Sequence, residues 1–421
     1  MNICKIPTKN FFVQKSINKF FSTFGHIKIR PADPIIGIVE EFHKDKSSIK
    51  VNLSAGTYKD EEGKPYILNC VRKAQKLILE KNYDHEYLPI EGIPSFNHNS
   101  IKLAYTSENK ALKEGRIAKC QTLSGSGAIR IGMEFLKDFY PGPKKVMVPN
   151  PSWPIHKQII NRSHLQFLEY RYYDIEKKGL DLNGMLEDLY KAEEGTIVLL
   201  HVCAHNPTGM DPSNSEWDKI LKVVQDRKLF PFFDMAYQGF SSGDLDRDAY
   251  SLRKFADTGM NLCLAQSYAK NFGLYSQRIG CFSLITDSKE EAISSESQIK
   301  FIARSQYSTP PKTGALIVDI ILSDPVLRNE WYKELKIMSG RINDMRYALY
   351  ENIKKSGSKL NWDHIIKQIG MFAYTGLTHE QVIKLKNDYH IYMTLSGRIS
   401  VAGLNQKNVE YVAKAFHEVS K

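Results

Sequence analysis

Lys270 stands in a stretch of sequence whose residue types suit carbonyl chemistry on a phosphorylated ligand. It follows the run 261–266, which is typical of a short buried strand. A lysine at the end of a buried strand is partly desolvated, which lowers its pKa and frees the amine to attack a carbonyl. Ser267 lies three residues before it and Arg278 eight residues after it, and both side chains can bind phosphate. The stretch predicts a Schiff base between Lys270 and a phosphorylated aldehyde cofactor.

A second candidate for phosphate binding is the cluster of small residues at 124–127. It precedes an amphipathic helical pattern whose apolar positions include Ile129, Met133 and Leu136. Backbone N–H groups and the positive end of the helix dipole favour an anion at such a place. Clusters of Ser and Gly are also common as simple caps and turns, so this cluster alone does not decide the matter.

Three further residues are ambiguous when each is taken alone. Asp234 follows an apolar run, where an aspartate usually caps a helix or forms a salt bridge. Trp153 lies between two prolines, where packing would explain it. Arg398 lies between a glycine and the apolar run 399–402, and this context favours an arginine whose guanidinium binds an anion over a surface charge.

The elements that must position these residues are short apolar runs that alternate with helical patterns. Near-continuous apolar runs fit strands that are buried on both faces of a largely parallel sheet. Helical patterns at 181–192 and 214–227 lie between them. We expect an α/β fold with helices on both faces of the sheet and with the chemistry at the carboxyl ends of the strands. The predicted strands are 145–150, 196–203, 229–233 and 278–285.

The C-terminal third has a different pattern, with one long helix and several short strands. We expect a large cofactor-binding domain over 65–337 and a smaller α+β domain built from 32–64 and 338–421. The expected elements of this third are a helix at 331–356, strands at 371–374, 391–393 and 397–402, and a closing helix at 408–419.

Composition excludes several classes of protein. The 421 residues are 42% hydrophobic, enough for a large core, and no uninterrupted apolar run reaches the length of a membrane-spanning helix. The six cysteines form no CxxC pair, which argues against a zinc site or a disulfide framework; we expect no metal. The net charge of +11 suits anionic metabolites, and no dense basic stripe predicts nucleic-acid binding.

The first residues have the composition of a mitochondrial transit peptide. Residues 1–32 contain six basic residues and no acidic one, mixed with aromatic and hydroxyl side chains. We expect a leader over residues 1–22 and the mitochondrial matrix as the location. The leader is rich in lysine rather than arginine, so a basic arm on a cytoplasmic protein is the alternative.

Taken in order, these segments resemble the aspartate aminotransferases, which are fold-type I pyridoxal-phosphate enzymes of class I. The resemblance runs from about residue 24 to the C-terminus and is greatest with the mitochondrial isoenzymes. The motifs that carry it are Tyr87-Leu-Pro-Ile-Glu-Gly92, Leu123-Ser-Gly-Ser-Gly-Ala128, His201-Val-Cys-Ala-His-Asn-Pro-Thr-Gly209, Phe233-Asp-Met-Ala-Tyr-Gln-Gly-Phe240, the segment 267–278 and Gly397-Arg-Ile-Ser400.

This resemblance implies pyridoxal 5'-phosphate as the cofactor and gives each candidate a role. Lys270 holds the cofactor as an internal aldimine and later moves the α-proton as general acid and base. Asp234 keeps the pyridine nitrogen protonated, and Tyr237 is the third catalytic residue. Tyr237 and Asn206 hydrogen-bond the phenolate oxygen, and Trp153 stacks on the ring. The implied phosphate ligands are Ser124, Gly125, Ser126, Ser267 and Arg278, together with Tyr87 from the second subunit of a homodimer.

The resemblance also implies the reaction, L-aspartate + 2-oxoglutarate = oxaloacetate + L-glutamate. Arg398 clamps the α-carboxylate, and Arg304 pairs with the distal carboxylate across the dimer interface. A buried guanidinium left unpaired by an uncharged substrate is costly, so dicarboxylic substrates are preferred. Gly56, Trp153 and Asn206 complete the implied substrate site.

Departures from the family pattern and two alternatives remain. The family usually has Gly at the position of Ser54 and Asn at the positions of Ile155 and Thr309. The sequence does not decide how these differences affect the fit of the substrate or the closure of the small domain. An aromatic amino acid aminotransferase would share this scaffold. A binding protein with a second role, for example at a membrane surface, would keep the same residues.

Overall fold

The computed structural model describes residues 23–29, 33 and 35–421, and the described residues up to 33 and those from 35 onward belong to two separate units. In the first unit, residues 23–26 form a turn, and the Ile27 amide donates to the Phe24 carbonyl at 3.0 Å. The predicted leader, 1–22, lies outside the described residues. Within the described ranges, no helix is both long and apolar enough to cross a lipid bilayer.

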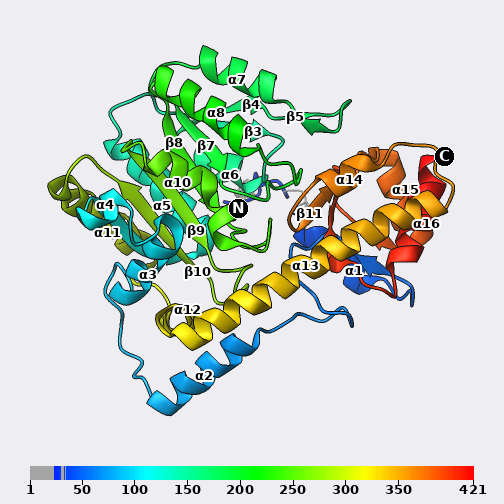
Figure 1. Cartoon of the computed structure of the whole chain (residues 1–421), viewed down its shortest axis with the longest axis horizontal. Coiled ribbons are helices and arrows are strands. Elements are labelled where there is room, and N and C mark those ends of the chain that lie inside the picture. The colour runs from blue at the N-terminus through cyan, green and yellow to red at the C-terminus, as the bar shows by residue number, and fades with distance from the viewer. Residues whose placement is uncertain (1–22, 30–32, 34) are drawn as a thin grey trace, which may run out of the picture. The chain divides into compact units, whose positions relative to one another are not determined.

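The second unit is built on a seven-stranded sheet (Figure 1). Neighbouring strands pair in parallel from β9 to β4, and β10 runs antiparallel to both of its neighbours, β9 and β2. The prediction of a mostly parallel sheet is therefore confirmed. In spatial order the strands are β2 (Ile117–Leu123), β10 (Ile279–Ile285), β9 (Leu262–Ser267), β8 (Phe230–Met235), β7 (Ile197–His201), β3 (Lys145–Asn150) and β4 (Gln166–Arg171).

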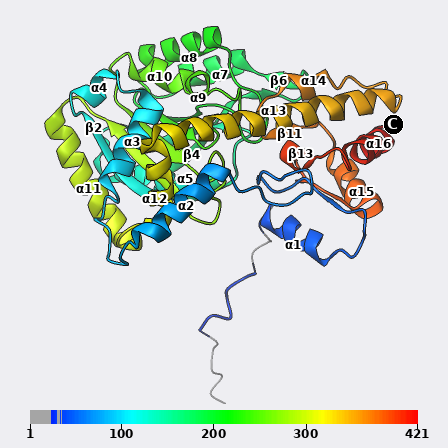
Figure 2. The ribbon, with the colours of Figure 1, turned by 60° about the horizontal axis from the view of Figure 1, so that its bottom comes forward.

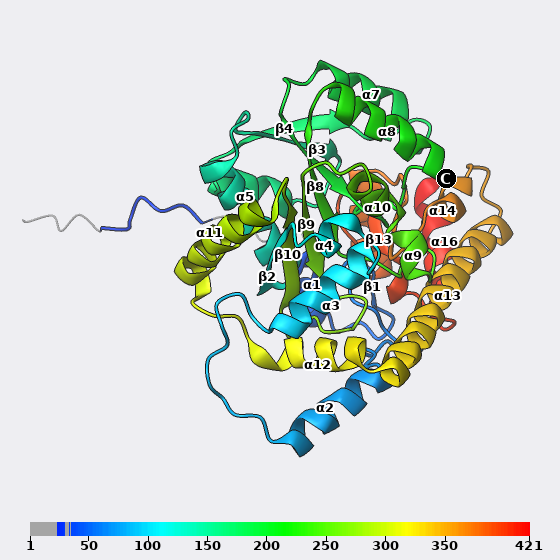
Figure 3. The same cartoon turned by 60° about the vertical axis from the view of Figure 1, so that its left-hand side comes forward.

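Both faces of this sheet are buried beneath helices, as the apolar runs predict. Successive side chains of β7 alternate between two core clusters: Ile197 joins one cluster and Val198 joins the other. Figure 3 shows α5 and α11 on one side of the sheet and α10 on the other. The helices of this layer are α3 (Pro94–Tyr105), α4 (Lys110–Lys113), α5 (Ser124–Phe139), α6 (Ile155–Arg162), α7 (Leu182–Lys191), α8 (Asn214–Asp226), α9 (Leu245–Asp248), α10 (Tyr250–Ala256), α11 (Lys289–Tyr307) and α12 (Lys312–Ser323).

The chain segments before and after this sheet associate with each other. Val51 in β1 pairs with Ile391 in β12, and the Ser400 amide donates to the Leu53 carbonyl at 2.7 Å. Residues from the start and end of the chain thus share one substructure, although the domain boundaries remain a prediction. Its elements are α1 (Ile36–Lys44), β1 (Val51–Asn52), α14 (Asp363–Lys367), β11 (Phe372–Tyr374), α15 (His379–Tyr389), β12 (Ile391–Tyr392), β13 (Arg398–Ser400), a 3-10 turn (Val401–Gly403) and α16 (Val409–Ser420); the hairpin β5 (Tyr173–Asp174) and β6 (Gly179–Leu180) lies elsewhere.

Helix α13 (Pro325–Lys355) connects this substructure to the layer of the sheet (Figure 2). It contacts α12 and α2 (Asn69–Lys81) near its beginning and α14 and α16 further along. The predicted start at 331 is six residues too late, because Asp324 caps the helix by accepting from the amides of Val326 and Leu327, and Pro325 fits the first turn.

Arg346 of α13 is 1% exposed and has no carboxylate within ion-pair distance among the described residues. Its guanidinium donates instead to the carbonyls of Ile365 at 3.1 Å, Gly370 at 2.6 Å and Phe372 at 2.9 Å. Burial lowers its pKa to about 9. One side chain therefore fixes the segment 365–372.

Replacing Arg346 should destabilise the fold more than its location outside the sheet suggests. In Arg346→Met three buried carbonyls lose their donor, and we expect the free energy of unfolding to fall by roughly 3 kcal/mol. Denaturant unfolding followed by circular dichroism measures this. The control Lys355→Met, an exposed position on the same helix, should change it by less than about 0.5 kcal/mol. Equal stabilities of the two variants would contradict the role given to Arg346.

Candidate active site

A cavity of about 220 Å³ opens at the carboxyl ends of β7, β8 and β9, beside the first turn of α5. This is the sheet edge where the sequence places the chemistry. Ten predicted residues line it: Ser124, Gly125, Ser126, Trp153, Asn206, Asp234, Tyr237, Ser267, Lys270 and Arg278. Segments more than 150 residues apart in the sequence are thereby brought together.

Lys270 lies three residues beyond the end of β9. Burial, with a smaller contribution from the charges of Arg278 and Arg398, lowers the pKa of its amine to about 8. The Nζ atom is 5.1 Å from the centroid of the Tyr275 ring and 6.0 Å from that of Tyr237. The amine is thus held among aromatic rings and has no carboxylate within ion-pair distance among the described residues.

The reactivity of Lys270 should follow this lowered pKa. At pH 8 about half of these amines are neutral, against well under about 1% for an ordinary lysine. We expect labelling of the cofactor-free protein by a small aldehyde and borohydride to rise through pH 8, measured at the Lys270 peptide by mass spectrometry. The folded-state pKa lies below the unfolded value of 10.5, so the unfolded chain binds more protons and stability rises with pH between about 8 and 10.5.

Exposed lysines of the same protein supply the control for this titration. Lys219 and Lys384 are exposed, and their peptides serve as internal references for the labelling of Lys270 over the same pH range. A midpoint for Lys270 that coincides with theirs would contradict the desolvation argument.

The start of α5 forms a cradle for an anion. Ser124 is the first residue of this helix, so the small residues form its first turn rather than precede it as the sequence suggested. The Ser124 Oγ lies 2.9 Å from the Ser267 Oγ, and a Cβ at position 125 would lie 3.1 Å from the Ser267 Cβ. Hydroxyls, free N–H groups and the Arg278 guanidinium form a donor set that suits a phosphate dianion.

The backbone around this cradle depends on a glycine in the neighbouring strand. A Cβ at Gly280 of β10 would lie 2.6 Å from the Ser124 carbonyl carbon, and only 2.4 Å from the Gln266 carbonyl oxygen. Glycine therefore permits the close approach of β9, β10 and the start of α5.

Asp234, the penultimate residue of β8, is part of a buried hydrogen-bond chain. Its Oδ2 is 3.0 Å from the His156 Nε2, and the His156 Nδ1 is 2.9 Å from the Ser152 Oγ. Burial lowers the pKa of the adjacent His201 to about 3, so this ring is neutral. His156, His201 and Asp234 also have the spacing of metal ligands. Their hydrogen bonds already explain why these side chains lie together.

His156 is a site residue that the sequence analysis missed. It lies one helical turn after Trp153, and the two rings meet edge to face with their centroids 5.2 Å apart. A histidine three residues from a candidate ring-stacking tryptophan was the available signal.

Arg398, the first residue of β13, is 3% exposed; it does not itself line the cavity but contacts Asn206, which does. Its Nη1 donates to the Asn206 Oδ1 at 3.2 Å, and its Nη2 donates to the Ser54 carbonyl at 2.6 Å. Its Nε has no partner among the described residues, and burial lowers its pKa to about 10. A buried guanidinium without a carboxylate partner and with a free donor suits a carboxylate ligand.

The surroundings of Arg398 explain two other predicted positions. The Phe372 ring centroid lies 4.3 Å from the guanidinium carbon, and a Cβ at Gly56 would lie 3.0 Å from the edge of this ring. The Ser54 hydroxyl donates to the Asn52 Oδ1 at 2.8 Å. The departure from Gly at position 54 is therefore accommodated by a hydrogen bond away from the guanidinium.

Tyr87 and Arg304 do not line this cavity in the single chain. Tyr87 is 82% exposed and lies, with Thr309, on a separate cavity of about 510 Å³. Arg304 is exposed near the end of α11 and donates to the Ser308 Oγ. Their sequence-based roles require a second copy of the chain.

Comparisons with known proteins agree along nearly the whole chain. The sequence profile described as aminotransferase class I and II matches residues 48–416. The mitochondrial aspartate aminotransferase of Dictyostelium discoideum is 48% identical over 413 residues, 97% of either chain. That of Gallus gallus is 48% identical over 400 residues, 95% of either chain.

Solved structures give the same result. The structure of a mitochondrial aspartate aminotransferase from Trypanosoma brucei superimposes with a TM-score of 0.89 at 46% identity, covering 91% of this chain and 100% of that chain. An aromatic-amino-acid aminotransferase from Burkholderia pseudomallei, covalently bound to pyridoxal phosphate, has a TM-score of 0.92 at 40% identity, covering 95% of this chain and 100% of that chain.

Proposed function

The chain belongs to the class I and II aminotransferase family, and we propose that it is an aspartate aminotransferase that uses pyridoxal 5'-phosphate. The enzyme transfers the amino group of L-aspartate to 2-oxoglutarate and gives oxaloacetate and L-glutamate. The observation that carries this proposal is the juxtaposition of a desolvated amine, Lys270, with a buried guanidinium that has a free donor, Arg398.

The residues present fit the cofactor. The helix start with Ser124, the Ser267 hydroxyl and Arg278 offers donors for its phosphate, and Gly125 leaves room beside Ser267. Asp234 supplies a carboxylate for the ring nitrogen, with Trp153 for a ring face and with Tyr237 for the phenolate oxygen. When bound, the cofactor supplies an electron sink for the substrate carbanion.

The protein's own groups then do the remaining work. Arg398 orients the substrate by its α-carboxylate, which directs the α-hydrogen towards Lys270. The Lys270 amine accepts the proton from the substrate α-carbon and then delivers a proton to the carbon that receives it in the exchange. A pKa of about 8 suits an amine that must both accept and donate a proton. The His156 ring holds the Asp234 carboxylate in place through a hydrogen bond of 3.0 Å between Nε2 and Oδ2.

A homodimer with shared active sites completes this proposal. Tyr87 and Arg304 are exposed in the single chain, and we assign them to the cavity of a second copy, Tyr87 for the phosphate and Arg304 for the distal carboxylate. The names of the similar curated proteins and the basic, acid-free residues 1–32 support import into the mitochondrial matrix, with cleavage near residue 22.

An aromatic amino acid aminotransferase is the second candidate, because a solved member of that group is 40% identical over nearly the whole chain. A coupled assay for oxaloacetate tests the choice. We expect kcat/KM for aspartate to exceed that for phenylalanine, and Arg304→Ala to lower the aspartate value by roughly 100-fold and the phenylalanine value by less than about threefold. Faster turnover of phenylalanine by the unmodified enzyme would contradict the proposed substrate.

Subunit complementation tests the shared sites. In a mixed dimer of Lys270→Ala and Arg304→Ala chains, one site retains both Lys270 and a partner's Arg304, and the other site has neither. Co-expression of the two variants should therefore restore about a quarter of wild-type activity with aspartate, by random pairing of subunits. Activity no greater than the average of the two single variants would refute sharing across the interface.

A further inference from the structure

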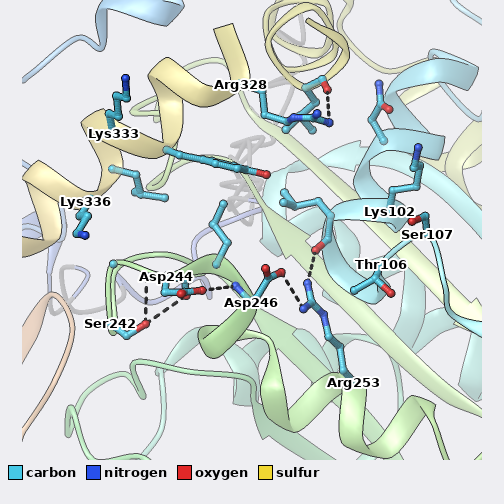
Figure 4. A pocket seen from close by; sticks show the side chains of 17 residues that line it. Lys102, Thr106, Ser107, Ser242, Asp244, Asp246, Arg253, Arg328, Lys333 and Lys336 are labelled. Carbon is cyan, nitrogen blue, oxygen red and sulfur yellow. Dashed lines mark hydrogen bonds and ion pairs between the residues drawn. The ribbon is translucent and has the colours of Figure 1, made fainter. Parts of the chain in front are cut away.

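A second cavity, of about 790 Å³, lies away from the Lys270 cavity and shares no lining residue with it (Figure 4). Its walls come from the end of α3, the segment before α9, α10 and the first half of α13. It also shares no residue with the cavity beside Tyr87, where the proposed second subunit would lie. The proposed reaction makes no use of this site, whose volume is within the usual range for small-molecule pockets.

Four cations on its walls have no carboxylate partner among the described residues. Lys102 extends from α3, and α13 contributes Arg328, Lys333 and Lys336. Arg328 makes one long hydrogen bond, 3.4 Å from its Nη1 to the Leu322 carbonyl. Lys333 and Lys336 are three residues apart on this helix, where like charges repel, and a bound anion would reduce that repulsion.

The acidic groups at the cavity are already engaged. The Asp244 Oδ1 caps α9 by accepting from the amides of Asp246 and Arg247, at 2.8 and 3.0 Å. The Asp246 Oδ1 pairs with the Arg253 Nη1 at 2.8 Å. Arg253 is fully engaged as well, since it also donates to two carbonyls at the end of α3. The balance on the walls is therefore five cations against two carboxylates, with the four unpaired cations free to bind.

An aromatic ring lies among these charges. Tyr332 of α13 lines the same cavity as these cations. Figure 4 shows Lys102 and Lys336 on opposite sides of this cavity. Tyr332 is 42% exposed although it lines a cavity, and apolar atoms of Leu245 and Leu335 lie nearby on the walls. A flat ring offers a stacking face to a base, and separated cations suit several phosphate charges.

We infer that this cavity is a binding site for a nucleoside polyphosphate. The phosphates lie among Lys102, Arg328, Lys333 and Lys336, and the base lies against the Tyr332 ring. A single carboxylate or sulfate would leave most of these cations unpaired. The inference does not depend on the proposed reaction, because the two cavities have separate residues.

Calorimetric titration of the holoenzyme with ATP, at low ionic strength, tests the site. Bound cofactor already fills the other phosphate cradle, so the titration reports the second cavity. The triple variant Arg328→Ala/Lys333→Ala/Lys336→Ala should raise the Kd by at least about tenfold. The control Arg162→Ala/Lys219→Ala/Lys384→Ala removes the same charges from exposed positions without ion-pair partners, and should change the Kd by less than about twofold.

Two further arms separate the phosphate contacts from the base contact. Tyr332→Ala should weaken ATP binding and leave the binding of inorganic triphosphate unchanged, and unmodified enzyme should bind ATP more tightly than triphosphate. Transamination rates of all variants should equal that of the unmodified enzyme, which shows that they are folded. No ATP binding at millimolar concentration, an equal loss in the control triple, or equal affinities for ATP and triphosphate would each overturn the inference.

Discussion

Lys270→Ala should lower the rate of amino transfer between aspartate and 2-oxoglutarate by at least about 10⁴-fold, the upper range for the loss of a general acid and base. The truncated side chain leaves no primary amine among the residues that line the cavity, where Arg278 is the other basic side chain besides the neutral His201 ring. The same change removes the group that attaches the cofactor and the group that moves the proton. Both losses should appear as a fall in kcat, because Arg398 still binds the substrate.

Two measurements distinguish this loss from a defect in folding. Borohydride reduction should fix the cofactor covalently to the Lys270 peptide of the unmodified enzyme and to no peptide of the variant, as mass spectrometry will report. Small primary amines should restore part of the rate, because the deleted side chain leaves space for them, whereas bulky amines should not. A variant that transaminates at the wild-type rate would refute the mechanism.

Asp234→Ala has the second-largest expected effect, a fall in kcat of roughly 10³-fold. Asp234 is buried at the end of β8, where its carboxylate faces the cavity and is held by His156 at 3.0 Å. Without this negative charge, the ring nitrogen of the cofactor loses the group that keeps it protonated. Asp234→Asn keeps the shape but not the charge, and should be nearly as slow.

The neighbouring histidine provides a graded control for this prediction. His156→Ala removes a positioning contact and leaves the carboxylate in place, so its loss should be only about tenfold. A cofactor analogue methylated at the ring nitrogen carries a permanent positive charge, and should recover activity in Asp234→Ala but not in Lys270→Ala. If His156→Ala and Asp234→Ala are equally impaired, the charge of Asp234 is not the decisive feature.

The strands that carry the site could be predicted from the sequence because they are buried on both faces. The run 145–150 coincides with β3, and the predicted strands at 196–203 and 229–233 contain or overlap β7 and β8. Polar residues follow each run, and the parallel arrangement brings them to one edge. This reasoning places Asn206, Asp234 and Lys270 on one cavity before any coordinates are known.

The same reasoning fails where a buried strand carries polar side chains. The sequence of β2 includes Gln121 and Thr122, so no apolar run marks it. Gln121 is nevertheless fully buried. Its side-chain oxygen accepts from the Ile93 amide at 3.2 Å and its nitrogen donates to the Pro311 carbonyl at 2.8 Å, so the buried amide is satisfied. The sequence analysis also missed β4, because this edge strand has exposed residues along its length and so lacks an apolar run. Long-range partners of this kind are not encoded in local periodicity.

The site residues show a similar division. Types and spacing single out Lys270 and the candidate phosphate ligands Ser267 and Arg278, whereas His156 is connected to the site by a hydrogen bond to a residue 78 positions away. The roles of Tyr87 and Arg304 belong to a pair of chains, and a single chain displays both residues on its surface. Subunit complementation therefore examines the part of the prediction that lies beyond one chain.

The unbroken course of α13 has a mechanical consequence. At 1.5 Å per residue, Arg346 lies about 32 Å along the axis from Pro325, so a tilt of about 3° at that end displaces its guanidinium by roughly 1.7 Å. That displacement is large enough to break hydrogen bonds of 2.6–3.1 Å to the segment 365–372 unless this segment moves too. A tilt of α13 would therefore move the segment 365–372, which is hydrogen-bonded to Arg346. Phe372, whose ring packs against Arg398, would move with this segment.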